Sequence, residues 1–209
     1  MKLLVATRSP GKRREVLRLL EGSGLEVLFP DDAGVPPSPE EQSLETHETF
    51  EGNARAKAEF FHRRTGLVTV ADDSGLEVFA LGGEPGVRSR RWAGRDGTEH
   101  IVSAANNAYL IQRLLGAPPA KRRARYRCVL ALVRGTKLLP EIFEGACAGT
   151  IAERPRGEGG FGYDPLFVSD ELGKTFGEAD ASEKDVVSHR GRAFAALRAA
   201  LVSTQEPVS

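Results

Sequence analysis

Two adjacent carboxylates, Asp72 and Asp73, are the residues of this chain whose types and spacing most directly indicate chemistry. They follow residues 68–71, Val-Thr-Val-Ala, a run that is typical of a short buried strand. Ser74 and Gly75 come next and indicate a turn, so we expect the strand to end at the carboxylates. An unpartnered buried charge costs roughly several kcal/mol. If buried, the pair therefore needs a hydrated magnesium ion or a Lys or Arg beside it; otherwise it is a solvated turn.

A second candidate is an anion site near Lys12. Residues 2–7 form an apolar run typical of a strand buried on both faces, residues 8–12 form a turn, and residues 13–20 have helical spacing. A strand, a basic turn and a helix N-terminus in succession offer free backbone N–H groups and a favourable dipole to an anion. The GxxxxGK[ST] pattern of a P-loop is absent. The same pattern is also ordinary α/β architecture.

Glycines surround two aromatic residues in residues 157–165, Gly-Glu-Gly-Gly-Phe-Gly-Tyr-Asp-Pro. The stretch resembles a dinucleotide fingerprint only superficially, since an Asp-Pro pair and a strand over 166–168 follow it instead of a helix. Glycines beside Phe161 and Tyr163 suit a bent loop where backbone approaches a flat ligand closely. A tight hairpin with a buried aromatic residue explains the pattern equally well.

Further polar residues lie near the ends of predicted helices. Thr49 is a suitable N-cap for the helix that follows it, and Lys57 lies one turn beyond Asn53, so both side chains can point the same way. Taken alone, Glu45 and Lys57 are typical of a solvated surface. Residues 188–190, Ser-His-Arg, stand at a break between two predicted C-terminal helices.

Charge and composition limit the classes of function. The 29 Lys and Arg residues balance 29 Asp and Glu residues, so net charge gives no argument for a polyanionic partner. A nucleic-acid binder using Arg122–Arg127 is an alternative that this balance disfavours. Cys128 and Cys147 show no metal-ligand spacing, which favours a reducing cytoplasm. The N-terminal apolar run is too short for a signal peptide, and no stretch approaches the roughly 20 apolar residues of a membrane helix, so we expect a soluble cytoplasmic protein.

The hydrophobic pattern predicts the elements that position these residues. We expect strands over 2–7, 25–29, 68–71, 126–133, 138–143, 146–151 and 166–168, and helices over 13–20, 50–64 and 98–115. Residues 76–81 continue as extended chain. Residues 30–45, rich in proline and acidic residues, are expected to form an exposed, mobile loop. Asp180 or Ser182 caps a short helix, and a longer one follows it.

Several stretches occur in one order along the chain: Thr7–Lys12 with Glu15, Glu45-Thr46 with Thr49-Phe50, Asn53-Ala54 with Lys57-Ala58, Ala71–Leu76, Gly82-Gly83 with Pro85-Gly86, Gly159–Pro165, and Glu183-Lys184 with Ser188-His189-Arg190. Together they resemble the inosine triphosphatase-like nucleoside triphosphate pyrophosphatases. That family hydrolyses deaminated purine triphosphates such as ITP, dITP and XTP to the monophosphate and pyrophosphate. The resemblance runs from Leu4 to about Leu197 and covers nearly the whole chain.

The resemblance implies a magnesium-dependent phosphate site. Glu45, Asp72 and Asp73 would form the acidic cluster that binds Mg²⁺, with Asp73 as the general base for water. Because a metal-bound carboxylate is a poorer base, either aspartate could fill both roles. Lys12 and Lys57 would hold phosphates as point charges. Further substrate contacts would come from Thr7, Arg8, Ser9 and Ser74.

The resemblance also implies a purine site. Phe161 would stack on the base, and Asp164 would accept a hydrogen bond from a purine ring N–H. Donors to a 6-oxo group would line the purine end. Adenine carries an amino donor at position 6, so such a pocket would leave groups unpaired at a penalty of about 1–3 kcal/mol each. The residues implied beside Phe161 and Asp164 are Gly162, Tyr163, Lys184, His189 and Arg190.

The chain departs from the family pattern at three places. Ser9 stands where the first loop of the family has Asn, His47 stands where Gly is usual, and residues 88–91 read Arg-Ser-Arg-Arg where the family often has Tyr-Ser-Ala-Arg. Ser9 keeps a hydroxyl but loses the amide donor, which affects a phosphate or sugar contact. The other two changes would alter the surface or a dimer contact more than the chemistry.

These observations predict an α/β fold, a long twisted mixed sheet flanked by helices in two lobes with a central cleft. We expect residues 1–204 to form a single two-lobed pyrophosphatase domain and residues 205–209 a disordered tail. The resemblance implies a homodimer that binds a purine nucleoside triphosphate and neither nucleic acid nor membrane. A related pyrophosphatase for modified pyrimidine nucleotides and a nucleotide-binding module without turnover are the alternatives.

Overall fold

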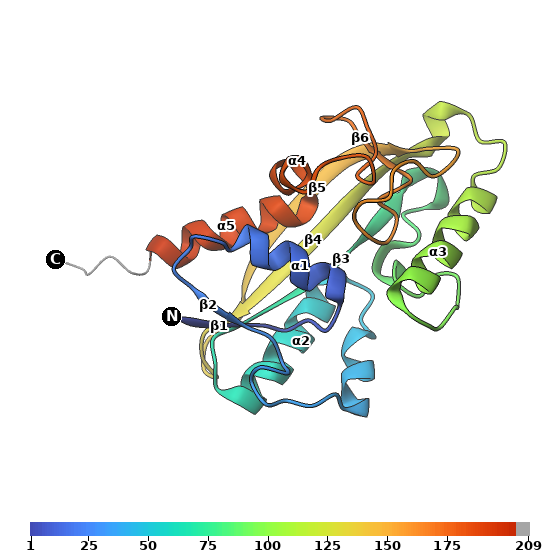
Figure 1. Cartoon of the computed structure of the whole chain (residues 1–209). Helices are drawn as coiled ribbons and strands as arrows, with labels where there is room; N and C mark the ends of the chain where they lie inside the picture. The colour runs from blue at the N-terminus through green and yellow to red at the C-terminus, as the bar shows by residue number, and fades with distance from the viewer. Residues whose placement is uncertain (204–209) are drawn as a thin grey trace. The chain divides into compact units, whose positions relative to one another are not determined.

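The computed structural model describes residues 1–203, whose strands join in one six-stranded sheet of order β2-β1-β3-β4-β5-β6 (Figure 1). β1 pairs in parallel with β2 and β3, whereas β6 pairs antiparallel with β5. A mixed sheet with helices packed on it confirms the predicted α/β class. The strands are β1 (Lys2–Val5), β2 (Glu26–Leu28), β3 (Thr69–Val78), β4 (Arg123–Val133), β5 (Glu141–Ile151) and β6 (Phe167–Ser169).

The helices begin and end at recognisable caps. Ser9 is the N-cap of the first helix, which starts at Pro10, three residues before the predicted start, because proline suits the first helical position. Thr49 caps the second helix as predicted and accepts a hydrogen bond from the N–H of Gly52 at 3.1 Å. No helix within residues 1–203 is long and apolar enough to cross a membrane. The helices are α1 (Pro10–Leu19), α2 (Phe50–Thr65), α3 (Glu99–Arg113), α4 (Ala181–Val187) and α5 (His189–Ser203), with short 3₁₀ helices η1 (Pro39–Glu45), η2 (Phe79–Leu81), η3 (Gly86–Arg88) and η4 (Pro119–Arg122).

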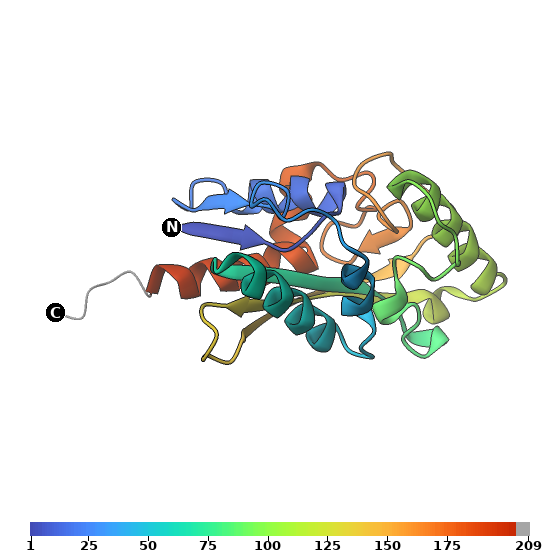
Figure 2. The same cartoon turned by 90° about the horizontal axis from the view of Figure 1, so that it is seen from below.

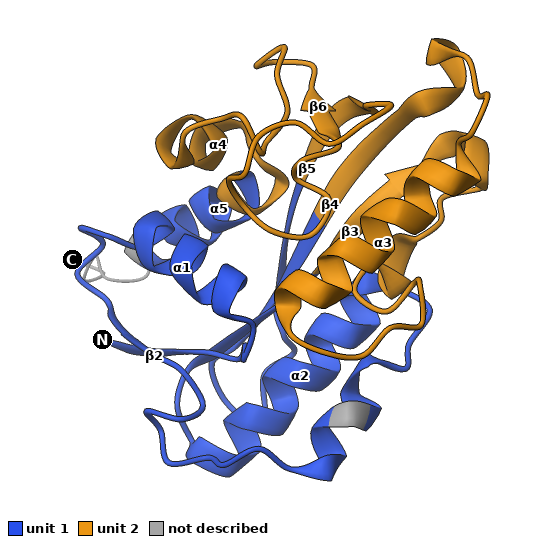
Figure 3. Cartoon of the chain, turned by 45° about the vertical axis from the view of Figure 1, so that its right-hand side comes forward, with its two compact units in different colours: residues 1–73, 128–145, 192–209 blue, residues 74–127, 146–191 orange. Residues whose placement is uncertain are grey.

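The chain divides into two compact units (Figure 3). Unit 1 consists of residues 1–73, 128–145 and those from 192 onward, and unit 2 consists of residues 74–127 and 146–191. Strands β3, β4 and β5 each contribute residues to both units. A single two-lobed domain over 1–204 and its central cleft stay predictions, and the predicted tail over 205–209 lies outside the described residues.

Unit 1 has helices on both faces of its strands. α1 and α5 lie on one side and α2 on the other (Figure 3). β1 and β2 run side by side in the same direction, with Leu3 opposite Val27 (Figure 2). The core under α1 and α5 comprises Leu3, Val5, Val16, Leu20, Phe29, Val70, Cys128, Leu130, Leu132, Ala193, Phe194, Leu197 and Leu201. Alternate residues of β1 and β4 supply this core, as expected for strands that are buried on both faces.

Unit 2 has a separate core, to which α3 contributes Leu110 and its C-cap contributes Leu114. Aromatic rings fill its centre: the ring centroids of Tyr126 and Phe167 lie 4.7 Å apart, and those of Phe167 and Phe176 lie 5.1 Å apart. Cys147 is buried in the same cluster. The loop over 157–165 packs onto this core through Tyr163.

The prediction that a strand ends at the carboxylate pair is wrong. β3 continues from Thr69 through Asp72 and Asp73 to Val78. Leu76 and Val78 are fully buried in the core of unit 2, and the N–H of Leu76 donates to the Ser89 hydroxyl at 2.9 Å. Because both apolar side chains need the strand alternation to continue, the Ser-Gly pair stays extended instead of turning.

Two other local predictions are corrected. The separate strands expected over 138–143 and 146–151 are one strand, β5, which starts at Glu141 and passes through Gly145 without a break. The loop expected over 30–45 contains η1, and Val35 within it is buried. Composition did not reveal the hydrogen bonds that order this loop, because they come from Arg8, far from it in the sequence.

Candidate functional site

Asp72 and Asp73 leave β3 on opposite faces. Asp72 shares the face of Val70, which packs beneath α1, and its Oδ1 lies 3.0 Å from Nζ of Lys12 on that helix. The Asp73 side chain meets α2, where Asn53 Nδ2 donates to its Oδ2 at 3.0 Å. Side chains of successive strand residues alternate in direction, so the two carboxylates are kept apart. Each has its own cationic partner.

Lys57 joins Asp73 to a third carboxylate. Its ammonium group lies 3.2 Å from Asp73 Oδ1 and 2.9 Å from Glu45 Oε1, and it donates to the backbone carbonyl of Asp72 at 2.6 Å. Lys57 lies one turn after Asn53 on α2, and the two side chains point the same way, as predicted; both contact Asp73. We call Lys12, Glu45, Asn53, Lys57, Asp72 and Asp73 the carboxylate–lysine cluster.

Burial and charge oppose each other in this cluster. Burial alone would lower the pKa of Lys57, but the charges of Asp73, Glu45 and Asp72 outweigh it and raise that pKa above its ordinary value. Burial also raises the pKa of Asp73 above 3.8, although Lys57, Lys12 and the Asn53 hydrogen bond partly oppose the shift. Lys57 is therefore a permanent cation, and Asp73 holds its proton more strongly than an exposed aspartate.

The donor set fits a hydrated magnesium ion. Among residues 1–203, no three His, Cys, Asp or Glu side chains gather closely enough to hold a metal by themselves, and the opposite directions of Asp72 and Asp73 explain this. Glu45 and Asp73, however, already share one cation, the Lys57 ammonium. Mg²⁺ usually takes only one or two carboxylates and completes its shell with water and substrate phosphate. The residues present are compatible with that mode.

The turn before α1 has the predicted features of an anion site. Ser9, in place of the family asparagine, caps α1 through its hydroxyl, which accepts from the N–H of Lys12 at 3.4 Å. Serine and asparagine are equally good N-caps, so the substitution keeps the helix start. The Thr7 hydroxyl accepts from the N–H of Ser9 at 3.3 Å. Lys12 thus lies in the first turn, where the helix dipole favours anions.

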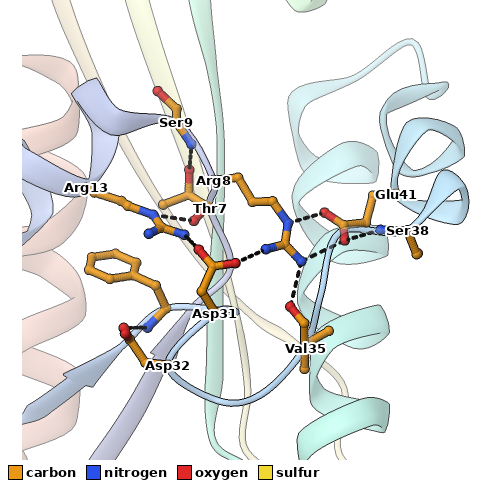
Figure 4. A network of polar contacts seen from close by, with 10 residues as sticks. Thr7, Arg8, Ser9, Arg13, Asp31, Asp32, Val35, Ser38 and Glu41 are labelled. Atoms are coloured by element: carbon orange, nitrogen blue, oxygen red, sulfur yellow. Dashed lines mark hydrogen bonds and ion pairs between the residues drawn. The ribbon is translucent and has the colours of Figure 1, made fainter.

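Arg8, which is predicted to contact substrate, makes four hydrogen bonds within unit 1 (Figure 4). Its guanidinium makes a two-pronged contact with Glu41 at 2.7 and 2.8 Å and donates to Asp31 at 2.5 Å and to the Val35 carbonyl at 2.9 Å. The hydrogen bonds to Glu41 raise the pKa of Arg8 further. Arg13 holds the other oxygen of Asp31 at 2.5 Å. These contacts fasten the 30–45 segment, and with it η1 and its last residue Glu45, to the end of β1.

Unit 2 gathers basic side chains around one aromatic ring. Nζ of Lys184 lies 5.3 Å from the centroid of the Phe161 ring, and Cζ of Arg190 lies 5.6 Å from it. Arg190 also donates to the Ser74 hydroxyl at 2.7 Å. His189 stacks on Tyr126, with ring centroids 4.5 Å apart and planes 7° apart. We call Ser74, Phe161, Asp164, Lys184, His189 and Arg190 the aromatic–basic cluster.

Asp164 ties the cluster to its loop. Its Oδ2 accepts from the N–H of Phe161 at 2.8 Å and from Nζ of Lys184 at 2.5 Å. Asp164 and Lys184 are both almost fully buried. A Cβ on Gly160, where φ is +72°, would lie 2.0 Å from the same Oδ2. Glycine is required there because this carboxylate approaches the backbone so closely.

The loop over 157–165 has a buried aromatic residue and a half-buried one. Tyr163 is buried, and its hydroxyl donates to the Ser89 carbonyl at 2.8 Å. Burial raises the pKa of this phenol far above its ordinary value. Phe161 is only half-buried. Tyr163 therefore anchors the loop, as one alternative predicted, whereas the Phe161 ring keeps part of its surface exposed.

The arginines of the basic run over 121–127 all have partners within unit 2. Arg122 is buried and donates to the carbonyls of Ile151, Ala152 and Leu114 at 2.7 to 3.0 Å. Arg123 pairs with Asp170 at 2.7 Å, and Arg125 and Arg127 both pair with Glu77. These contacts leave little reason to propose a nucleic-acid surface here.

Sequence reasoning missed three residues that hold these clusters together. Asn53 was recognised as a motif residue but not as a partner of Asp73. Ser103 and Asn107 on α3 hold the backbone of Gly162, at 3.2 and 3.1 Å. Asn107 gave one weak signal in the sequence. Asparagine is a poor helix former, so an asparagine inside a predicted helix indicates that its side chain makes a specific contact.

The fold and the two clusters define an α/β protein with one set of groups for anions and cations and another for a flat ring. The chain belongs to the Ham1 family, whose sequence model matches residues 3–200. It is 49% identical over 203 residues to a Mycobacterium tuberculosis protein named dITP/XTP pyrophosphatase, covering 97% of this chain and 96% of that protein.

Solved structures agree with this assignment. A HAM1 protein from Coxiella burnetii matches with a TM-score of 0.83 and 35% identity, covering 97% of this chain and 99% of that one. A nucleoside-triphosphatase, also named dITP/XTP pyrophosphatase, from Mycobacterium abscessus matches with a TM-score of 0.69 and 45% identity over 94% of this chain and 98% of that one. Both likenesses extend over nearly the whole chain.

Proposed function

We propose that this protein hydrolyses deaminated purine nucleoside triphosphates, ITP, dITP and XTP, to the nucleoside monophosphate and pyrophosphate. The observation that carries the proposal is the carboxylate–lysine cluster, in which Lys12 and Lys57 face three carboxylates. Its occurrence in a Ham1 chain, with relatives named dITP/XTP pyrophosphatase, supports hydrolysis of a phosphoric anhydride. Such a reaction would remove deaminated purines from the nucleotide pool.

The carboxylate–lysine cluster supplies the groups for the triphosphate. Lys12 and Lys57 bind phosphate oxygens as point charges, and the positive end of the α1 helix dipole lies near Lys12. Of the three predicted metal ligands, Glu45 and Asp73, which share the Lys57 ammonium, would hold Mg²⁺. The ion offsets the negative charge of the phosphates when bound. Asp72 points to Lys12 on the other face of β3. Phosphate oxygens compete with Asp73 and Glu45 for Lys57, so substrate binding loosens the ammonium from these carboxylates.

Asp73 is the proposed general base. A water oxygen attacks the α-phosphorus, the bond from that phosphorus to the bridging oxygen breaks, and pyrophosphate leaves with the bond electrons. The water proton passes to the Asp73 carboxylate. Its raised pKa makes it a better proton acceptor than an exposed aspartate. Asn53 holds this carboxylate in place through its 3.0 Å hydrogen bond.

The aromatic–basic cluster supplies the groups for the base. Phe161 offers a half-buried ring for stacking, while Lys184, His189 and Arg190 are donors for a 6-oxo oxygen. Asp164 accepts a hydrogen bond from the purine ring N–H. A carboxylate has about four acceptor sites, and the contacts with the Phe161 N–H and with Lys184 use two of them. Adenine places a donor where this cluster has donors, and each group left unpaired costs about 1–3 kcal/mol. Hypoxanthine and xanthine carry an acceptor there.

The experiment is a substrate panel with and without Mg²⁺. We expect stoichiometric pyrophosphate from dITP, ITP and XTP, none from dATP, and loss of turnover when magnesium is chelated. Stepwise release of orthophosphate would contradict the proposed reaction. Turnover confined to modified pyrimidine nucleotides would contradict the substrate class, and absence of any release would favour binding without catalysis.

We also propose that the protein acts in the cytoplasm as a homodimer. Both statements rest on the resemblance to the family, and the cytoplasmic location is consistent with cysteines that show no disulfide pattern. Light scattering of the purified chain at micromolar concentration tests the oligomeric state. A mass near 22.6 kDa, that of one chain, would contradict the dimer.

A further inference from the structure

α3 contains two adjacent buried asparagines, Asn106 and Asn107, that hold two different loops of unit 2. Asn106 donates to the carbonyls of Ser89 and Arg90 at 3.1 and 2.9 Å and accepts from the N–H of Ala93 at 2.9 Å. The buried asparagines sit where a helix normally has apolar residues. Because asparagine is an unfavourable residue inside a helix, these contacts explain why the sequence places the pair there.

Asn107 reaches the glycine-rich loop instead. Its Nδ2 donates to the carbonyl of Gly162 at 3.1 Å, and the hydroxyl of Ser103, one turn earlier on α3, accepts from the N–H of Gly162 at 3.2 Å. Residues four apart on a helix lie on one face, so both side chains point to the same place. One face of α3 therefore binds both the N–H and the carbonyl of Gly162. The Oδ1 of Asn107 is buried and accepts no hydrogen bond from the described residues.

Gly162 is the residue directly after Phe161. Its φ of +63° is a left-handed conformation that glycine adopts at little steric cost, so the backbone can turn directly after Phe161. Toward the other side, the Phe161 N–H is held by Asp164 at 2.8 Å, and Tyr163 is held by its hydroxyl at the Ser89 carbonyl. Ser89 is also a partner of Asn106, so α3 supports the loop at Gly162 and, through Ser89, at Tyr163.

We propose that Ser103 and Asn107 of α3 are positioning residues for purine binding, which fix the Phe161 ring by holding both backbone groups of Gly162. This rests on the proposed function, because it assigns Phe161 to the base. α3 contains none of the motif residues from which the family was identified. Ser103 and Asn107 touch the loop and act on substrate only through it.

The test compares Ser103→Ala and Asn107→Asp with wild type and with Thr98→Ala. Ser103→Ala removes one hydrogen bond, and Asn107→Asp replaces the Nδ2 donor by an oxygen facing the Gly162 carbonyl. Thr98 is the N-cap of the same helix and accepts from Ile101 at 3.4 Å, so its variant weakens α3 without touching Gly162. We expect KM for dITP to rise about five-fold in Ser103→Ala and more in Asn107→Asp, in keeping with the loss of one net hydrogen bond, while kcat changes less than about two-fold.

A double-mutant cycle separates positioning from general stability. In a Phe161→Ala background, Ser103→Ala should no longer raise KM, since the ring that it positions is gone. Additive effects, or a KM in Thr98→Ala that rises as much as in Ser103→Ala, would overturn the proposal. Melting temperatures of wild type and of every variant, including Phe161→Ala and the double variant, show whether each is folded.

Amide hydrogen exchange keeps this test independent of the proposed activity. Ser103→Ala should speed exchange of the Gly162 amide at least about five-fold, because the hydroxyl no longer protects that N–H. Calorimetry with dIMP and dAMP then reports base recognition without turnover. If wild type releases no pyrophosphate from dITP, the proposed function fails, whereas faster exchange together with weaker dIMP binding still supports the positioning role. Unchanged exchange at Gly162 would overturn it even in an active enzyme.

Discussion

Asp72 and Asp73 are neighbours in β3, yet their carboxylates contact lysines on different helices: Lys12 of α1 lies 3.0 Å from Asp72, and Lys57 of α2 lies 3.2 Å from Asp73. A turn at this place would have allowed both side chains to face water on one side. A continuous strand instead sends one to each face, where a helix supplies the counter-charge. Two buried like charges are thus accommodated in adjacent positions because each has a counter-charge on its own face of the strand.

Removal of Lys57 should be strongly destabilising. In Lys57→Met, Asp73 and Glu45 lose a shared cation while Asp73 stays buried, and an uncompensated buried charge costs about 3–5 kcal/mol. Urea unfolding gives the free energy of unfolding. Lys2→Met is the matched control, since Lys2 and its partner Glu26 are both more than half exposed, and we expect a change within about 0.5 kcal/mol. Equal effects of the two substitutions would show that the cluster is solvated.

Asp73→Asn should remove catalysis while preserving the contacts of Asn53 and Lys57 in part. The amide cannot accept the water proton, so we expect kcat for dITP to fall about 10²- to 10⁴-fold with a much smaller change in KM. The exposed Asp96→Asn is the control and should leave kcat as in wild type. An unchanged kcat in Asp73→Asn would show that Asp73 is not the general base, and Asp72 would then be the next candidate.

The raised pKa of Asp73 has a definite consequence for stability. The native state holds this proton more tightly than the unfolded chain, whose value is near 3.8. The contribution of Asp73 to stability is therefore fully present below that pH and is lost as pH rises through the raised native pKa. The ¹³C shift of the Asp73 carboxyl, followed against pH in metal-free protein, should titrate above pH 3.8. A midpoint below 3.8 would mean that Lys57 and Lys12 outweigh burial.

Arg8→Lys should disturb Glu45 from a distance. A lysine cannot make the two-pronged contact with Glu41 and also reach the Val35 carbonyl, so η1 loses its attachment to the end of β1. We expect a loss of about 1–2 kcal/mol and faster amide exchange over residues 39–45. Arg55→Lys, which alters a surface pair with Glu51 four residues earlier, is the control and should do neither. Unchanged exchange over 39–45 would show that another contact orders η1.

The sequence predicted those parts of the site that depend on local spacing. Thr49 as an N-cap and the shared direction of Asn53 and Lys57 follow from helix geometry alone, and both are confirmed. The continuation of β3 beyond Asp73 could not be predicted from local sequence, because Ser-Gly after two aspartates is an ordinary turn signal. Burial of Leu76 and Val78 in unit 2 overrides that signal, and nothing in the stretch itself reveals this.

Long-range partners were beyond the reach of spacing. Arg8 and Glu41 are 33 residues apart, and Asn107 and Gly162 are 55 residues apart. Spacing along the sequence therefore did not reveal that Arg8 fastens the 30–45 segment through Glu41 and Asp31. For the same reason, the sequence did not reveal that Arg123 pairs with Asp170 and that Arg127 pairs with Glu77.

The close approach of Asp164 to Gly160 can be tested with a matched pair of glycines in unit 2. Gly160 and Gly173 have φ values of +72° and +67°, so alanine at either position adds a similar backbone cost of about 1 kcal/mol. Nothing lies within 4 Å of a Cβ on Gly173, whereas a Cβ on Gly160 would lie 2.0 Å from Asp164 Oδ2. Gly160→Ala must therefore also displace the carboxylate that holds Lys184 and the Phe161 N–H.

We expect Gly160→Ala to lower the free energy of unfolding by at least about 2 kcal/mol more than Gly173→Ala and to raise KM for dITP, because displacing a buried ion-paired carboxylate leaves Lys184 uncompensated. Equal free energies of unfolding for the two variants would mean that Asp164 moves aside freely and does not fix the base loop.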